Sequence, residues 1–351
     1  MTEVDLREVL KELTALTGPS GFEGGASGRA MELLAPLVDE VYTDRLGSVI
    51  GLRRCGRPGA KKVLLDAHLD EVSLIVTGIE DGFLRFQTIG GVDLRMLPDR
   101  EVTVLAPEPL FGVVTCLPPH VQSAADHDTA AKLEALFVDV GLSQEEAEKR
   151  IPIGTPMTFR AGAFALGEKR FCGKALDDRA CFAALLRCGE LLRDKPLDVD
   201  VYFVGSSREE VGGWGARCAG FSAAPDWCVA VDVTHGATPD AAKSGGGAVT
   251  ELGEGPVIEI GPVTPRWMSE LLEQTAGEGD IPYQREILPG LSDTNGDDYQ
   301  IAREGIATAV LSLPLRYMHT PVETIDLADL EHLSRLLADF VIKLGKEGTP
   351  C

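Results

Sequence analysis

A short apolar run that leads into two adjacent carboxylates places the strongest limit on how this chain can fold. Residues 201–204 have the length and composition of a buried strand, and Glu209 and Glu210 follow it, ahead of a glycine cluster. Adjacent carboxylates repel each other and are usually solvated. In open α/β sheets, however, ligands bind outside the carboxyl ends of the strands. A carboxylate pair there is expected where a cation neutralises one member and the other handles a proton.

Three further apolar strands lead to side chains that can bind a metal ion, namely His68, Asp232 and His319. One more carboxylate, Asp177 or its neighbour Asp178, lies where a loop enters a helix. With one glutamate of the pair, this gives two histidines and three carboxylates. That is a common ligand set for two zinc-like ions that share a bridging carboxylate. The sequence therefore predicts two divalent ions, and zinc and cobalt both suit nitrogen and oxygen ligands.

Two residues beside these expected ligands are interpreted separately. Asp70 comes two residues after His68, so its carboxylate is placed to accept the ring N–H of that histidine and fix its tautomer. His235 lies three residues past the expected end of the strand that carries Asp232, and we interpret it as structural.

Charge and cysteine content exclude several classes of partner. A formal net charge of −22 argues against binding to nucleic acid or to an anionic membrane. No apolar run reaches the roughly 18 residues of a membrane-spanning helix, and the acidic N-terminus does not resemble a secretory signal. The eight cysteines are scattered without a Cys-x-x-Cys motif, which favours reduced thiols and a cytoplasmic location.

The order of expected elements predicts an α/β fold in two parts. Strands alternate with amphipathic helices before residue 71 and again after residue 168. Between them, short β-like runs are separated by Gly and Pro. We therefore expect a discontinuous α/β domain over 1–71 and 168–351, and an inserted β-rich domain over 72–167. A capped helix is expected after Ser143, and Asp326 is expected to cap a closing helix that runs to residue 344.

With these motifs assembled, the chain resembles the M42 family of dinuclear metallo-aminopeptidases, which includes glutamyl aminopeptidases, TET peptidases and members named endoglucanases. The resemblance covers about residues 5–345 and rests on several motifs together. These are Gly18-Pro-Ser-Gly21, His68-Leu-Asp-Glu71, Pro118-Pro-His120, Leu176-Asp-Asp-Arg179, Glu209-Glu-Val-Gly-Gly-Trp-Gly-Ala216, Val231-Asp-Val233 and Arg316-Tyr-Met-His-Thr-Pro321.

The resemblance implies a role for each matching residue. It implies the metal ligands His68, Asp177, Glu210, Asp232 and His319. It makes Asp177 the bridging ligand, often through a cis peptide to Asp178, and Glu209 the general base that activates a metal-bridged water. The implied activity is release of N-terminal amino acids from short peptides. The implied architecture is a mixed-sheet α/β/α, phosphorylase/hydrolase-like domain whose inserted domain builds homo-oligomers, typically dodecamers.

One stretch departs from the family pattern, and alternative functions stay open. Where the family usually has a Gly-Thr-Asp-Ala-like turn, residues 290–298 match only at Asp293, which leaves the substrate preference undetermined. A metal-dependent amidohydrolase or deacylase acting on N-acyl compounds would use the same ligands. A non-catalytic binding or scaffold protein would be expected to have lost some of them. A glycosidase needs two carboxylates without metal ligands and fits poorly.

Overall fold

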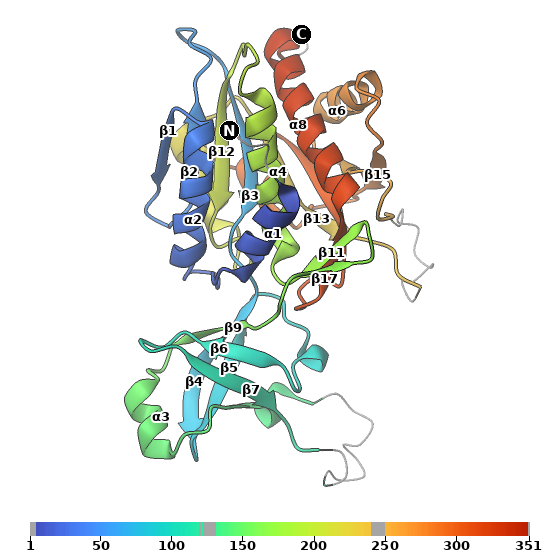
Figure 1. Cartoon of the computed structure of the whole chain (residues 1–351). Coiled ribbons are helices and arrows are strands. Elements are labelled where there is room, and N and C mark those ends of the chain that lie inside the picture. Colours follow the sequence, from blue (N-terminus) through green and yellow to red (C-terminus); the bar gives the residue numbers. More distant parts are fainter. Residues whose placement is uncertain (1–4, 119–120, 122–130, 240–249, 350–351) are drawn as a thin grey trace.

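The computed structural model describes residues 5–118, 121, 131–239 and 250–349. An 11-stranded mixed sheet forms its larger part, with the path β1-β2-β12-β3-β13-β16-β17-β11-β10 and with β14 and β15 extending from β16 (Figure 1). The strands are β1 Glu40–Thr43, β2 Val49–Arg53, β3 Lys62–His68, β10 Phe164–Leu166, β11 Arg170–Gly173, β12 Asp200–Ser206, β13 Trp227–His235, β14 Val257–Ile260, β15 Gln284–Ile287, β16 Ala307–Arg316 and β17 Glu323–Asp326.

Helices cover both faces of this sheet. The helices of the described chain are α1 Leu6–Ala15, α2 Gly24–Leu34, α3 Gln144–Arg150, α4 Leu176–Leu192, α5 Trp214–Ala223, α6 Arg266–Glu278, α7 Asn295–Gln300 and α8 Leu327–Glu347. Of these, α3 lies away from this sheet, in the lower part of Figure 1. Helices α1, α2, α4 and α8 lie on one face (Figure 1), and α5 and α7 pack on β12, β13 and β16 from the other. Successive residues of a strand point to opposite faces of the sheet, and each face has its own hydrophobic core. In β3, Val63 and Leu65 lie in the larger core and Leu64 lies in the smaller one.

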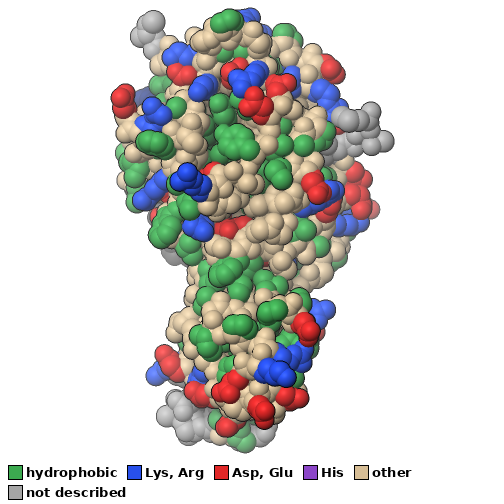
Figure 2. Space-filling view, turned by 90° about the vertical axis from the view of Figure 1, so that its left-hand side faces the viewer, with side chains coloured by type: hydrophobic (Ala, Val, Ile, Leu, Met, Phe, Trp, Pro, Cys, Tyr) green, Lys and Arg blue, Asp and Glu red, His purple; other side chains and the backbone are tan. Residues whose placement is uncertain are grey.

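A separate closed barrel lies below the sheet in Figure 1. Its strand order is β4-β5-β8-β7-β6-β9, and it has its own apolar core. Figure 2 shows the two parts as a broad body and a narrower lobe, with hydrophobic side chains gathered where they meet. The strands are β4 Ser73–Glu80, β5 Phe83–Ile89, β6 Glu101–Val104, β7 Leu110–Thr115, β8 Phe137–Asp139 and β9 Pro156–Phe159.

Three ion-paired residues join the chain segments that enter and leave the barrel. Glu71, just before β4, accepts hydrogen bonds from Lys174 Nζ at 2.6 Å and from an Arg179 guanidinium nitrogen at 3.2 Å. The guanidinium of Arg179 is fully buried and also donates to the carbonyls of Leu69, Leu13 and Leu16. A Cβ at Gly18 would come within 2.7 Å of this guanidinium, so a glycine is needed there.

The capping predictions are confirmed. Ser143 forms a full capping box with Glu146, and Asp326 accepts the N–H of Ala328 at the start of α8. Arg170–Gly173, just before α4, pairs with β17 as strand β11.

The described cysteines are all free, and Cys172, Cys181, Cys188 and Cys228 are buried. In the described part of the chain, no helix combines the length and apolar character needed to cross a bilayer.

Candidate metal centre and active site

Four neighbouring parallel strands bring the expected site residues to one edge of the sheet. The strands are, in sheet order, β12, β3, β13 and β16. His68 ends β3, Glu209 and Glu210 follow β12, Asp232 lies in β13 and His319 follows β16. All five line a cavity of about 710 Å³. This is the place where ligands bind in open α/β sheets.

Strand β13 is longer than the sequence indicated. It was expected to end at Asp232, but its pairing with β16 continues as far as His235 opposite Leu315. His235 is therefore the last residue of the strand, is exposed, and lines the same cavity. It does not belong to either of the two possible metal-binding groups found among the described residues.

Asp177 lies between the two histidines. Its Oδ1 is 3.0 Å from Nε2 of His68, and its Oδ2 is 3.2 Å from Nε2 of His319. Glu210 Oε1 lies 3.5 Å from the same nitrogen of His319. The ligand atoms of His68, Asp177 and Glu210 all lie within 4.8 Å of one another. A carboxylate whose two oxygens face two different histidines has the geometry of a ligand shared by two ions.

A second possible metal-binding group joins His68 to Asp178 and Asp232, again within 4.8 Å. The peptide bond between Asp177 and Asp178 is cis, as the family resemblance implied. Asp178 Oδ2 accepts the backbone N–H of His68 at 3.1 Å. Its buried Oδ1 has no hydrogen-bond partner among the described residues.

The charges of these buried groups are unbalanced. Burial raises the pKa of Glu210, Asp232 and Asp178 well above the usual values of carboxyl groups. Burial also acts on Asp177, but hydrogen bonds from His319 and His68 outweigh it and lower the pKa of that carboxyl. In the described part of the chain, the ion pairs of this cluster involve only histidines. A bound cation would supply the missing positive charge, so the residues present fit divalent metal ions.

Glu209 lies close to both groups but belongs to neither. Its Oε2 is 4.0 Å from Nε2 of His68, and its side chain is 18% exposed. Burial raises the pKa of this carboxyl to about 7, and the charges of Asp70 and Asp177 act in the same direction. A carboxylate with a pKa near neutrality is suited to accept and return a proton.

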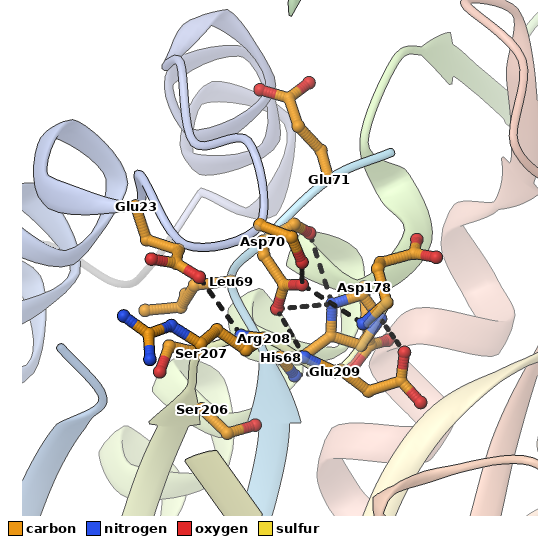
Figure 3. Close-up of polar contacts among 12 residues, drawn as sticks. Glu23, His68, Leu69, Asp70, Glu71, Asp178, Ser206, Ser207, Arg208 and Glu209 are labelled. Atoms are coloured by element: carbon orange, nitrogen blue, oxygen red, sulfur yellow. Dashed lines mark hydrogen bonds and ion pairs between the residues drawn. The ribbon is translucent and has the colours of Figure 1, made fainter. Parts of the chain in front are cut away.

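Asp70 holds the loop that carries both glutamates. Its Oδ1 accepts the backbone N–H of Glu209 at 3.1 Å (Figure 3). Its Oδ2 accepts the backbone N–H of Glu210, also at 3.1 Å. The hydroxyl of Ser20 also donates to this carboxylate. Nδ1 of His68 lies 3.6 Å from Oδ1 of Asp70 but 3.2 Å from its backbone carbonyl. The expected carboxylate contact is therefore the longer of the two, and Asp70 acts on the backbone of the loop.

Sequence reasoning missed Glu323, which supports two of the expected ligands. This buried side chain accepts the N–H of His319 through Oε1 at 2.8 Å and the N–H of Asp177 through Oε2 at 3.1 Å. Its position four residues after His319 was the available signal, but a glutamate in a Pro-Val-Glu-Thr run has no distinctive pattern.

The atypical stretch around residue 290 forms part of the cavity wall. Leu291 to Thr294 line the cavity, and α7 follows. Asp293 is exposed, whereas Asn295 is buried and donates to Asp66 and Ser206, both at 2.8 Å. Asn295 therefore connects this stretch to the sheet beneath the cavity. The motif residues Pro119 and His120 lie outside the described residues.

Comparisons with known proteins show which family the chain is similar to. A family model described as M42 glutamyl aminopeptidase matches residues 47–336. The lysyl aminopeptidase of Pyrococcus furiosus is 37% identical over 335 residues, which cover 94% of each chain.

Solved structures are similar over nearly the whole chain. Aminopeptidase APDkam598 from the archaeon Desulfurococcus kamchatkensis is 36% identical with a TM-score of 0.89, over 96% of this chain and 94% of that one. The TET1 peptidase of Pyrococcus horikoshii is 29% identical with a TM-score of 0.85, over 97% and 100%. The chain therefore belongs to the metal-dependent M42 family of glutamyl aminopeptidases.

Proposed function

We propose that this aminopeptidase binds two divalent ions through five side chains, with Asp177 as the shared ligand. The other ligands are His68, Glu210, Asp232 and His319. The observation that carries this assignment is the position of Asp177, whose two oxygens face the two histidines at 3.0 and 3.2 Å. Asp178 is instead engaged with the backbone of His68. Zinc and cobalt are the proposed ions, because both accept mixed imidazole and carboxylate ligands.

The ions would polarise the scissile carbonyl and lower the pKa of water. Glu209 then has a separate task, because it lies beside the ligands without joining them. It takes a proton from the attacking water and later delivers it to the leaving amine. Asp70 fixes the positions of Glu209 and Glu210 by accepting hydrogen bonds from their backbone N–H groups. A base must stay within hydrogen-bond reach of the proton that it moves, so this anchoring matters for the rate.

We further propose that the chain forms a homo-oligomer. The relative from Pyrococcus horikoshii is described as assembling into a tetrahedron or a large octahedral shell. In this proposal residues 72–167 form the assembly domain, except that β10 near their end pairs into the larger sheet, and residues 1–71 and 168–351 form the phosphorylase/hydrolase-like catalytic domain. Exposed apolar side chains on the barrel, such as Phe111 and Ile153, supply surface for contacts between subunits. Light scattering should give a mass several times the 37.5 kDa of one chain. A mass equal to that of one chain would contradict the proposed homo-oligomer.

The activity is tested with aminoacyl-p-nitroanilides and their N-acetylated counterparts. Each substrate is assayed with protein as purified, after chelation, and after zinc or cobalt is restored. We expect cleavage of the free-amine substrates only, lost on chelation and recovered with metal. Cleavage of the acetylated substrates alone would instead identify a deacylase. Full activity after chelation, with elemental analysis showing that metal is gone, would remove the metal centre from the proposal.

A further inference from the structure

A second set of carboxylates lines the cavity away from the expected metal ligands. Glu259 on β14 and Glu286 on β15 stand directly opposite each other in a parallel pair. Like charges in such positions repel and destabilise a sheet unless something compensates them. Asp297, on α7, lines the same cavity. The charges of Glu286 and Asp297 both raise the pKa of Glu259, after the larger effect of burial, so the three carboxylates influence one another.

Glu259 is the unusual member of this set. Its side chain is only 3% exposed, and its Oε1 accepts a hydrogen bond from Ser312 at 2.7 Å. Its Oε2 is buried without any hydrogen-bond partner among the described residues. Glu286 is half-buried, and its Oε2 accepts a hydrogen bond from Thr234 at 2.7 Å. A buried acceptor without a donor, next to a second carboxylate that a ligand can reach, is the arrangement of a site that lacks its cation.

The described lining of the cavity does not neutralise these charges. Its basic side chains are Arg217, His235 and the two expected metal ligands His68 and His319, whose rings face Asp177 instead of this set. The guanidinium of Arg217 is already paired with Asp298, at 2.5 Å. The metal ions of the proposed mechanism would neutralise the negative charge of their own ligands, but not the charge of Glu259, Glu286 and Asp297. A negative wall of this kind concentrates cations in the cavity and disfavours anions.

The acidic wall lies at a distance that suits the side chain of a bound substrate. Asp232 on β13 is beside Ser312 on β16, and β14 is the next strand along. Two strand spacings amount to about 10 Å. A lysine carries its charge at the end of a flexible four-carbon stem, and an arginine carries a planar guanidinium at similar reach.

We propose that Glu259, Glu286 and Asp297 form the pocket for the first side chain of the peptide and select a basic residue, lysine or arginine. Glu286 contacts the cationic group of the substrate. The negative charges of Glu259 and Asp297 further stabilise that positive charge. This inference rests on the proposed aminopeptidase function, because it assumes that the scissile bond lies at the metal centre.

The test compares lysine and norleucine p-nitroanilides, which differ chiefly by the ammonium group. We expect kcat/KM for lysine to exceed that for norleucine at least about tenfold, because a charged pocket is left unpaired by the apolar analogue. Glu286→Gln and Glu259→Gln should each lower this ratio by about tenfold or more. Glu251→Gln, an exposed glutamate outside the cavity lining, is the matched control and should leave the ratio unchanged.

Each other outcome has a definite meaning. Equal rates for the two substrates in the wild type, or a ratio that the two variants leave unchanged, would overturn the acidic pocket while leaving the aminopeptidase intact. If no p-nitroanilide is cleaved, the proposed function fails in this assay. The pocket is then tested by calorimetric titration of the metal-loaded protein with lysinamide and norleucine amide. Tighter binding of lysinamide, weakened by Glu286→Gln, would support the pocket, and equal binding would overturn it.

Discussion

At the scale of single residues, the sharpest expectation concerns the proposed general base. Glu209→Gln keeps the size and most contacts of the side chain but removes its ability to accept a proton. We expect turnover to fall about 10²–10⁴-fold, while both metal ions stay bound. Initial rates and elemental analysis of the dialysed protein check the two parts separately. A variant with near wild-type turnover would exclude Glu209 from proton transfer.

Glu323 gives a second prediction at this scale, because it holds the backbone of Asp177 and His319 without facing the cavity. In Glu323→Gln one oxygen acceptor becomes an NH₂ group that faces a backbone N–H, so one of the two hydrogen bonds is lost. We expect metal affinity to fall about 10–100-fold, as for other residues that orient ligands. Metal titration of the chelated protein measures this. Unchanged affinity would mean that the ligand positions do not depend on Glu323.

The sequence predicted the site residues that follow apolar strands. It did not predict the residues that hold those site residues in place through hydrogen bonds. His68, Asp232, His319 and the Glu209–Glu210 pair were predicted to lie together because neighbouring parallel strands end at one edge of a sheet, and the structure places them there. The roles of Glu323 and Asn295 depend on backbone groups and side chains that are distant in sequence. No local spacing encodes such contacts, so they became visible only in the folded chain.

At the scale of elements, the packing of α2 against β2 depends on a glycine. A Cβ at Gly51 would lie 2.6 Å from Cδ2 of the fully buried Leu34. Gly51→Ala should therefore lower the free energy of unfolding by about 1–3 kcal/mol. Gly28, within α2, has open space around its Cβ position, so Gly28→Ala should raise stability by up to about 1 kcal/mol. Denaturant unfolding of both variants checks this; equal effects would refute the packing argument.

The burial of Glu259 on β14 makes stability depend on pH. Burial raises the pKa of this carboxyl from 4.5 to about 7 in the folded chain. A raised carboxyl pKa favours the folded state while the group is protonated. The contribution is complete below about pH 4.5 and is lost as the pH rises through about 7, by on the order of 3 kcal/mol. The difference in unfolding free energy between wild type and Glu259→Gln should fall accordingly from pH 5 to pH 8. Parallel pH curves would contradict it.

Element prediction succeeded for the apolar strands at the centre of the sheet and failed for two short strands beside them. The runs that became β3, β12, β13 and β16 were expected from their buried residues. Gln284–Ile287 has three polar residues before a single apolar one and lies at the edge of the sheet, and no strand was expected there. Strand β14 was missed as well. Its identity as a strand depends on pairing with β15 and β16, which is a tertiary effect.

At the scale of the whole molecule, the metal centre should contribute to global stability. Ions that bind only the folded chain stabilise it by about 4 kcal/mol when their concentration is 1,000 times the dissociation constant. Chelation should therefore lower the thermal midpoint by roughly 10 °C, and added zinc or cobalt should restore it. Scanning calorimetry before and after chelation measures this. An unchanged midpoint, with metal loss shown by elemental analysis, would mean that the centre is not coupled to folding.

The ion pairs of Glu71 with Lys174 and Arg179 have a consequence for how such chains diversify. Glu71 and Lys174 are 103 positions apart, yet they hold the two ends of the intervening segment together within the larger part. These ion pairs lie outside the strands of the barrel, whereas the carbonyl of Gly91, after β5, contacts Nδ1 of His319 at 2.7 Å. We therefore expect the barrel to be replaceable as a unit when the Gly91 contact is kept. We expect a chimera that carries a relative's barrel to keep the catalytic framework of this chain while adopting the particle size of the donor.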